Sequence, residues 1–220
     1  VEAPAYLGVV VFFLFVFSIF LYRGNHRGWL LASIILSLLL SFGKNFSLLT
    51  DLFIDYFPIY DKFRAVSSIQ VILELCIPIF AVLGLSKLIS QEVEYKSKFR
   101  ALNYTVILFF SILLTLFLFK GYLSYSGVSD QYMDDTIVEA LISDRKNIFI
   151  NQLQRTSFFI STAYLIIFLY LKSKLSKQLL IISFGIIICY DLISFSKNYV
   201  NDENFVDPVF VENPFNKDDV

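Results

Sequence analysis

This chain has few of the residues from which metal and redox sites are usually built. Its 220 residues include 2 cysteines and 1 histidine. Cys76 and Cys189 lie far apart in the sequence, each inside an apolar run, which favours small hydrophobic core residues over a disulfide or a metal pair. Because His26 is the single histidine, the sequence excludes a metal site built from several His and Cys ligands.

Charge is scarce as well, and neither sign is in surplus. Charged residues make up 17% of the chain and the formal net charge is -1, so we expect no nucleic-acid partner. The first residues, VEAPAY, lack the basic start and the cleavage site of a signal peptide. Since an acid precedes the first apolar run and no initiator methionine is present, we expect an upstream portion of the same chain before Val1.

Apolar residues are abundant. They make up 57% of the chain, with 18% aromatic and a mean hydropathy of +0.68, whereas a soluble domain is roughly 45–50% apolar. The composition therefore predicts a membrane protein whose main partners are lipids. Six apolar runs stand out: 6–22, 29–42, 65–85, 102–119, 156–171 and 179–193.

These runs predict an all-α fold, a polytopic bundle over residues 1–196 with about six transmembrane helices and interfacial amphipathic helices. Several runs are shorter than the roughly 20 residues expected for a span, but flanking residues that snorkel can extend them. A re-entrant second run is the main alternative. An acidic, turn-rich tail over 197–220 is predicted to be extended and external.

The distribution of lysine and arginine predicts the orientation. The first, third and fifth connections are short and basic, whereas the second, fourth and the tail are longer or richer in acids. By the positive-inside rule the odd connections are cytoplasmic. The basic residues of the odd connections are Arg23, Arg27, Lys87, Lys96, Lys98, Arg100, Lys172, Lys174 and Lys177.

The third run carries an acid at membrane depth. Glu74 and Pro78 fall on one helical face with other polar or small residues, and this face is expected to look inward. Because proline lacks an N–H, the carbonyl of Glu74 loses its helical partner. The pair predicts either a polar site for a headgroup, proton or cation, or a carboxyl that is neutral or paired with a neighbouring helix.

The second connection, 43–64, mixes charges with aromatics and predicts a short interfacial amphipathic helix followed by a turn at Pro58. Lys44 can snorkel at the end of the second run. Arg64, which follows Lys62, lies at the outer mouth of the third helix. It can hold a phosphate with its guanidinium fork, or anchor the helix among ordinary headgroups.

The fourth connection predicts an external amphipathic helix near 130–155, with acids at its start and Arg145 later, as the helix dipole favours. Asp134, Asp135 and Glu139 suit a solvated first turn better than a metal site, so no metal ligands are predicted. Asp191, near the outer end of the sixth run, is expected to pair with a base such as Arg64 or Arg155.

Several segments together resemble the C-terminal part of the YfhO family of bacterial multi-pass membrane proteins. The matching segments are SFGKNFSLLTDLFIDYFPIYDKFRAVSS with the helix after it, LISDRKNIFINQLQRTSFF, CYDL and KNYVNDENFVDPVFVENPF. They cover about half of the chain in order, and none is a catalytic signature. The family often has a proline shortly after the arginine of KFR, whereas Ala65, Val66 and Ser67 follow here.

The resemblance implies a GT-C-like glycosyltransferase of the bacterial cytoplasmic membrane and cell envelope. Such an enzyme takes a sugar from a polyprenyl-phosphate donor on the extracytoplasmic side, and a divalent cation is a possible cofactor. Its catalytic acid would lie upstream of Val1, so no catalytic residue is expected in this chain. The substrate-binding candidates are Lys44, Lys62, Arg64 and Glu74. A lipid or solute transporter and a non-catalytic membrane scaffold are the alternatives.

Overall fold

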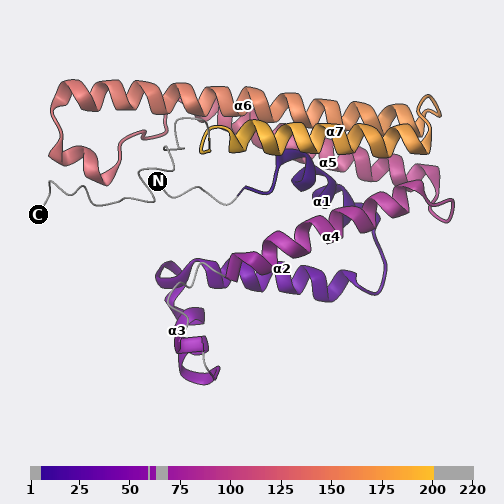
Figure 1. Cartoon of the computed structure of the whole chain (residues 1–220), viewed down its shortest axis with the longest axis horizontal. Helices are drawn as coiled ribbons and strands as arrows, with labels where there is room; N and C mark the ends of the chain where they lie inside the picture. The colour runs from indigo at the N-terminus through magenta and orange to yellow at the C-terminus, as the bar shows by residue number, and fades with distance from the viewer. Residues whose placement is uncertain (1–5, 59, 63–68, 201–220) are drawn as a thin grey trace, which may run out of the picture.

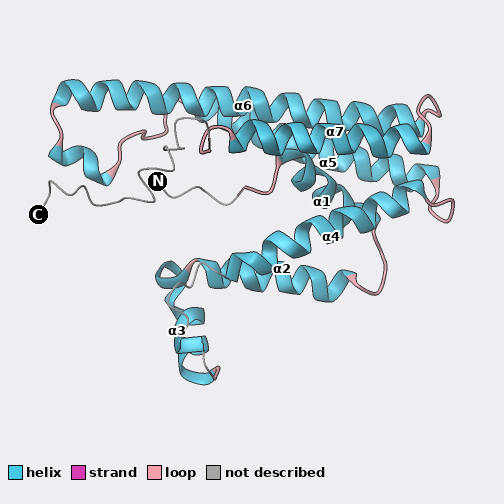
Figure 2. Cartoon of the chain, in the orientation of Figure 1, coloured by secondary structure: helices cyan, strands magenta, loops and turns pink. Residues whose placement is uncertain are grey.

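The computed structural model describes residues 6–58, 60–62 and 69–200, and these residues form helices and connections without any strand (Figure 2). The α-helices are α1 (Val9–Leu21), α2 (Arg27–Ser41), α3 (Ser47–Tyr56), α4 (Gln70–Ile89), α5 (Tyr95–Phe119), α6 (Asp135–Leu171) and α7 (Lys177–Ser196). Short 3-10 helices that lie within the described residues include η1 (Gly43–Phe46), η2 (Tyr60–Lys62) and η4 (Val128–Tyr132). The predicted all-α class is confirmed.

Helix α1 lies at the centre of the molecule and contacts α4, α5, α6 and α7. Its 13 residues are almost all apolar, and Phe13 and Phe17 are completely buried. A helix that is hydrophobic all round is stable only when other helices surround it, and that is its position here (Figure 1). At about 20 Å, its 13 residues are shorter than a hydrocarbon core, so α1 is a buried core helix by length.

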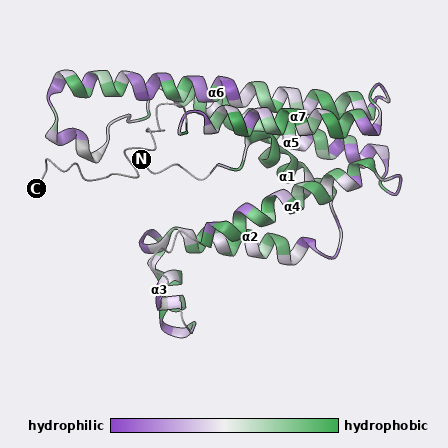
Figure 3. Cartoon of the chain, viewed as in Figure 1, coloured by the Kyte–Doolittle hydropathy of each residue, from purple (hydrophilic) through white to green (hydrophobic). Residues whose placement is uncertain are grey.

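Helices α5, α6 and α7 run alongside one another, and we call them together with α1 the bundle (Figure 1). Helix α6 is continuous over 37 residues because no glycine or proline interrupts it. The amphipathic helix expected near 130–155 is therefore not a separate element that turns along the bilayer. From Asp135 onward it is the first half of the helix that contains the apolar run 156–171, and Figure 3 shows this half as the more hydrophilic one.

Helices α2 and α4 pack against each other, and with η1, α3 and η2 they form what we call the arm. The Ser37 hydroxyl donates a hydrogen bond of 2.6 Å to the carbonyl oxygen of Ile69, so this serine of α2 links it to the start of α4. Gly43, with φ +50°, breaks the helix after α2. Helix α2 and the η1–α3 segment then lie at 110°, a geometry that fits a broken span or a re-entrant loop.

The arm joins the bundle where α4 crosses α1. At this crossing the Ser18 hydroxyl lies 3.4 Å from the carbonyl oxygen of Ala81 and donates to it, and it also donates to the carbonyl oxygen of Leu14 at 2.7 Å. Gly84 allows the close approach, since a Cβ there would lie 1.7 Å from the Ser18 hydroxyl oxygen. Small residues at a helix crossing let the backbones approach closely in an apolar medium.

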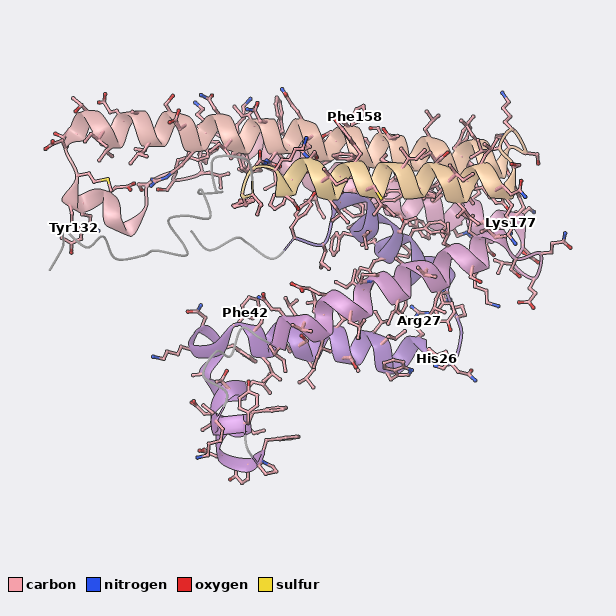
Figure 4. The ribbon with its side chains drawn as sticks, viewed as in Figure 1. His26, Arg27, Phe42, Tyr132, Phe158 and Lys177 are labelled. Atoms are coloured by element: carbon pink, nitrogen blue, oxygen red, sulfur yellow. The ribbon has the colours of Figure 1, made fainter. Side chains whose placement is uncertain are left out.

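The three short basic connections lie at one end of the molecule, which we call the basic end (Figure 1). His26, Arg27 and Lys177 mark this end in Figure 4. One cleft joins residues of the first and third connections, and a second joins residues of the third and fifth. The helices thus alternate in direction as the charge pattern predicts, and α3, the start of α6 and the end of α7 lie toward the opposite end (Figure 1).

Length and composition identify three helices that could cross a membrane, α4, α5 and α7, or four if the bent pair of α2 and α3 counts as one span. Six spans were expected, and these criteria support three or four. Large apolar side chains are exposed along α5 and α7. In a membrane protein, lipid covers surfaces of this kind. Cys76 is buried as predicted, whereas Cys189 is exposed on α7.

Candidate functional site

The most completely built polar cluster joins α6 and α7 at the end opposite the basic end. Arg155 donates hydrogen bonds of 2.7 Å from Nη2 to the backbone oxygen and to Oδ1 of Asp191, and one of 3.1 Å to the Ser194 hydroxyl. The side chain of Asp191 is 0% exposed and that of Arg155 is 20% exposed. The pairing of Asp191 with Arg155 that the sequence suggested is therefore present.

The carboxylate of Asp191 also forms hydrogen bonds with residues at the start of α1. Its Oδ1 accepts a hydrogen bond of 2.6 Å from the Tyr6 hydroxyl, and its Oδ2 accepts one of 3.3 Å from the backbone N–H of Val10. Val10 is in the first turn of α1, where N–H groups lack helical partners and the helix dipole favours an anion. Gly8 leaves room for this contact, because a Cβ there would lie 3.2 Å from Oδ2.

Aromatic rings surround the guanidinium of Arg155. Its Cζ lies 5.5 Å from the ring centroid of Tyr6, 5.2 Å from that of Phe159 and 5.6 Å from that of Phe195. Tyr6 and Phe195 stack with their centroids 3.7 Å apart. Every oxygen of the Asp191 carboxylate and its neighbouring carbonyl already accepts a hydrogen bond. The cluster therefore holds α1, α6 and α7 together.

A second ion pair closes the connection between α5 and α6. Arg145 donates in a fork to Asp130, from Nη1 to Oδ2 at 2.6 Å and from Nη2 to Oδ1 at 2.9 Å, and Nη1 also donates to the carbonyl oxygen of Tyr125. The backbone N–H of Gly127 donates to Oδ2 as well. Hydrogen bonds from Arg145 and Gly127 lower the pKa of Asp130 to about 2. Arg145 thus has a structural role.

The end of the arm presents bases beside aromatics. Lys44 lies in η1 and Lys62 in η2, and both are exposed. The ring of Phe53 in α3 stacks on Phe57 at 4.5 Å between centroids and meets Tyr60 at 5.5 Å. Aromatic rings beside basic side chains are typical of the membrane interface. Arg64, the favoured phosphate contact, lies outside the described residues, as does most of the predicted tail.

Glu74 and Pro78 are half-buried on α4, and α4 continues through the proline to Ile89. Glu74 makes no hydrogen bond or ion pair with any described residue, unlike Asp130 and Asp191. The face of α4 toward α1 is formed instead by buried apolar and small residues, Cys76, Ile77, Phe80, Ala81, Gly84 and Leu88. Glu74 can therefore still be either a polar site for a headgroup, proton or cation, or a structural carboxyl.

The structure divides the predicted site residues into two groups. Lys44, Lys62, Glu74 and Pro78 belong to the arm, and Arg145, Arg155 and Asp191 belong to the bundle or its connection. Sequence reasoning missed Tyr6 and Gly8, which complete the Asp191 cluster. The available signal was Gly8 inside the apolar run 6–22: a glycine at the start of a helix has no side chain to cap it, and no acid follows in the first turn.

The part of the chain that the structure describes contains no group of three or more His, Cys, Asp or Glu residues placed to hold a metal ion. Comparison with protein-family models, with curated proteins and with solved structures gave no match.

Proposed function

We propose that this chain is the C-terminal membrane portion of a glycosyltransferase that takes a sugar from a polyprenyl-phosphate donor on the extracytoplasmic side of the bacterial cytoplasmic membrane. The observation that supports the proposal is the end of the arm. Bases and stacked aromatics of η1, α3 and η2 precede the long apolar helix α4 in the chain. A donor of this kind needs a cation for its phosphate beside an apolar surface for its lipid chain.

In this proposal Lys62 and Arg64 contact the donor phosphate, and Lys44 adds positive charge. Glu74 and Pro78 shape the polar cavity behind them. The catalytic acid is supplied by the upstream portion of the chain. In this proposal the chain crosses the membrane six times, through α1, the α2–α3 pair, α4, α5, α6 and α7, with α1 as a short crossing enclosed by the other helices. The arm end and the tail are then outside and the basic end is in the cytoplasm.

Replacing Arg64 by alanine in the full-length protein tests the proposal. Loss of a charge-assisted, forked contact to phosphate lowers sugar transfer from a polyprenyl-phosphate donor by roughly 10- to 100-fold, while membrane insertion is unchanged. The matched control is Lys146→Ala, which removes an exposed positive charge from the first half of α6. Equal transfer by the Arg64→Ala protein and the unaltered protein would exclude this assignment.

A transporter or lipid flippase is the second candidate, and one observation favours it: the half-buried carboxyl of Glu74 lacks a partner among the described residues and lies one turn before Pro78. Reconstituted vesicles separate the two functions. Substrate crossing without a covalent product, abolished by Glu74→Gln, indicates transport, and product formation indicates the enzyme. A membrane scaffold, the third alternative, predicts neither activity.

A further inference from the structure

A cleft of about 630 Å³ lies at the basic end, and none of the residues used in the proposed function lines it. It is bounded by the end of α1, the connection between α4 and α5, and the first turns of α5. Its basic lining residues are Arg23, Lys87 and Arg100, and the side chains of Phe20, Leu21, Ala101 and Tyr104 form its apolar wall. The cleft therefore combines cations with hydrocarbon surface in one concavity.

The cations of this cleft are only partly neutralised. Lys87 forms an ion pair with Glu92, with 2.7 Å between Nζ and Oε2. Arg23 and Arg100 are exposed, and neither makes a hydrogen bond or ion pair with a residue in the described ranges. Glu94 also lines the cleft, so three bases face two acids. One positive charge is in excess, and two guanidinium forks are free of protein partners within the described part of the chain.

The position of the cleft favours a lipid. It lies where the candidate span α4 ends and the candidate span α5 begins. If these helices cross a membrane, the cleft is at the level of the lipid phosphates. An ordinary interfacial arginine meets headgroups from the outside of a single helix. Here the lining comes from three helices, and basic pockets between transmembrane helices are known binding sites for anionic headgroups.

We propose that this cleft binds the phosphate of an anionic lipid headgroup through Arg23 and Arg100, with the glycerol and upper acyl chain against the apolar wall. The site is independent of the proposed sugar transfer, because its residues belong to the opposite end of the molecule. A phosphate could also come from a soluble compound, and the apolar wall predicts that the lipid form binds more tightly.

Native mass spectrometry of the full chain in neutral detergent tests the proposal, since a neutral micelle has no anionic surface to attract bases in general. The chain is titrated with phosphatidylglycerol, with phosphatidylcholine and with glycerol phosphate. Arg23→Gln with Arg100→Gln weakens phosphatidylglycerol binding at least about tenfold, as expected for the loss of charge-assisted hydrogen bonds. The control, Arg27→Gln with Lys96→Gln, removes two charges at the same end outside the cleft and changes binding less than about twofold.

A second variant, Ser97→Phe, fills the cleft without changing its charge, and it should weaken phosphatidylglycerol binding while circular dichroism shows the helices intact. Equal binding of glycerol phosphate and phosphatidylglycerol would overturn the lipid assignment in favour of a soluble phosphate. Equal phosphatidylglycerol binding by the arginine variant, the filled variant and the control would overturn the site itself.

Discussion

The acids in the apolar helices of the bundle and of the arm differ in whether they have hydrogen-bond and ion-pair partners. In the bundle, buried Asp191 meets Arg155, Tyr6 and an N–H of α1, so its charge is paired and its oxygens are occupied. In the arm, Glu74 is half-buried and unpaired among the described residues, and Lys44 is exposed. The comparison teaches that polar residues in an apolar chain need not share one role. The paired ones in the bundle hold helices together, whereas Glu74 and Lys44 of the arm are the ones that we propose to act on a ligand.

The largest effect on the free energy of unfolding is expected from removing Arg155, the ion-pair partner of Asp191. Arg155→Met leaves the carboxylate of Asp191 buried without its partner, which costs about 3–5 kcal/mol of unfolding free energy. Adding Asp191→Leu recovers much of this loss, because both charges are then gone. Denaturant unfolding in detergent micelles measures the difference, with Lys146→Met on the exposed face of α6 as the control. Equal stability of the single variant and the control would contradict the structural role of the pair.

The junction between arm and bundle comes next. Gly84→Ala places a Cβ 2.8 Å from the Cα of Ser18, so α4 must move away from α1 at a cost of about 1–3 kcal/mol. Gly185→Ala on α7 is the matched control, since nothing lies within 4 Å of its added Cβ. Thermal unfolding of the two proteins is compared. A junction that tolerates both substitutions equally would show that α1 and α4 do not pack closely.

A smaller effect, confined to one connection, is expected on acidification. The pKa of Asp130 is lowered to about 2 in the folded chain and is higher when unfolded, so its contribution to stability is complete above about pH 4. It is lost as the pH falls from about 4 through 2, when the Asp130 carboxylate is protonated and releases Arg145. Limited digestion with pepsin, with rates divided by the rate for an unfolded substrate at the same pH, should cut residues 120–134 relatively faster at pH 2 than at pH 4. Asp130→Asn should make the relative rate similar at the two pH values.

The smallest effect on stability is expected in the arm. Glu74→Gln removes a charge that has no described partner, so the free energy of unfolding should change by less than about 1 kcal/mol. The same denaturant measurement applies, and Asp191→Asn serves as the contrasting substitution in the bundle. A loss for Glu74→Gln as large as that for Asp191→Asn would show that Glu74 is held by a strong partner and that the two regions are alike.

The sequence predicted the helical class and the direction of each helix, because apolar runs and clusters of bases are local signals. It did not predict that α1 is the central helix. Its run resembles any other apolar run, and its burial depends on how four other helices surround it. Of the six spans expected, three or four are supported by helix length and composition, and run length alone does not distinguish a lipid-exposed helix from one enclosed by protein.

The candidate site was predictable only where a residue was unusual in its surroundings. Asp191 and Glu74 stood out as acids in apolar runs, and Arg155 was one of the two bases named as a partner for Asp191. Tyr6 could not be assigned to this cluster, because 185 positions separate it from Asp191 and a tyrosine in an aromatic-rich chain is unremarkable. The cleft at the basic end was hidden because its lining comes from three separate segments.

The most direct test of the division between arm and bundle is photo-cross-linking of the full-length protein with a polyprenyl phosphate that carries a photoreactive group beside the phosphate. Mass spectrometry of the digested protein locates the adducts. The account predicts adducts within residues 44–64, and fewer of them after Lys62→Ala with Arg64→Ala. Adducts confined to α6 and α7, or unchanged by that double substitution, would contradict it.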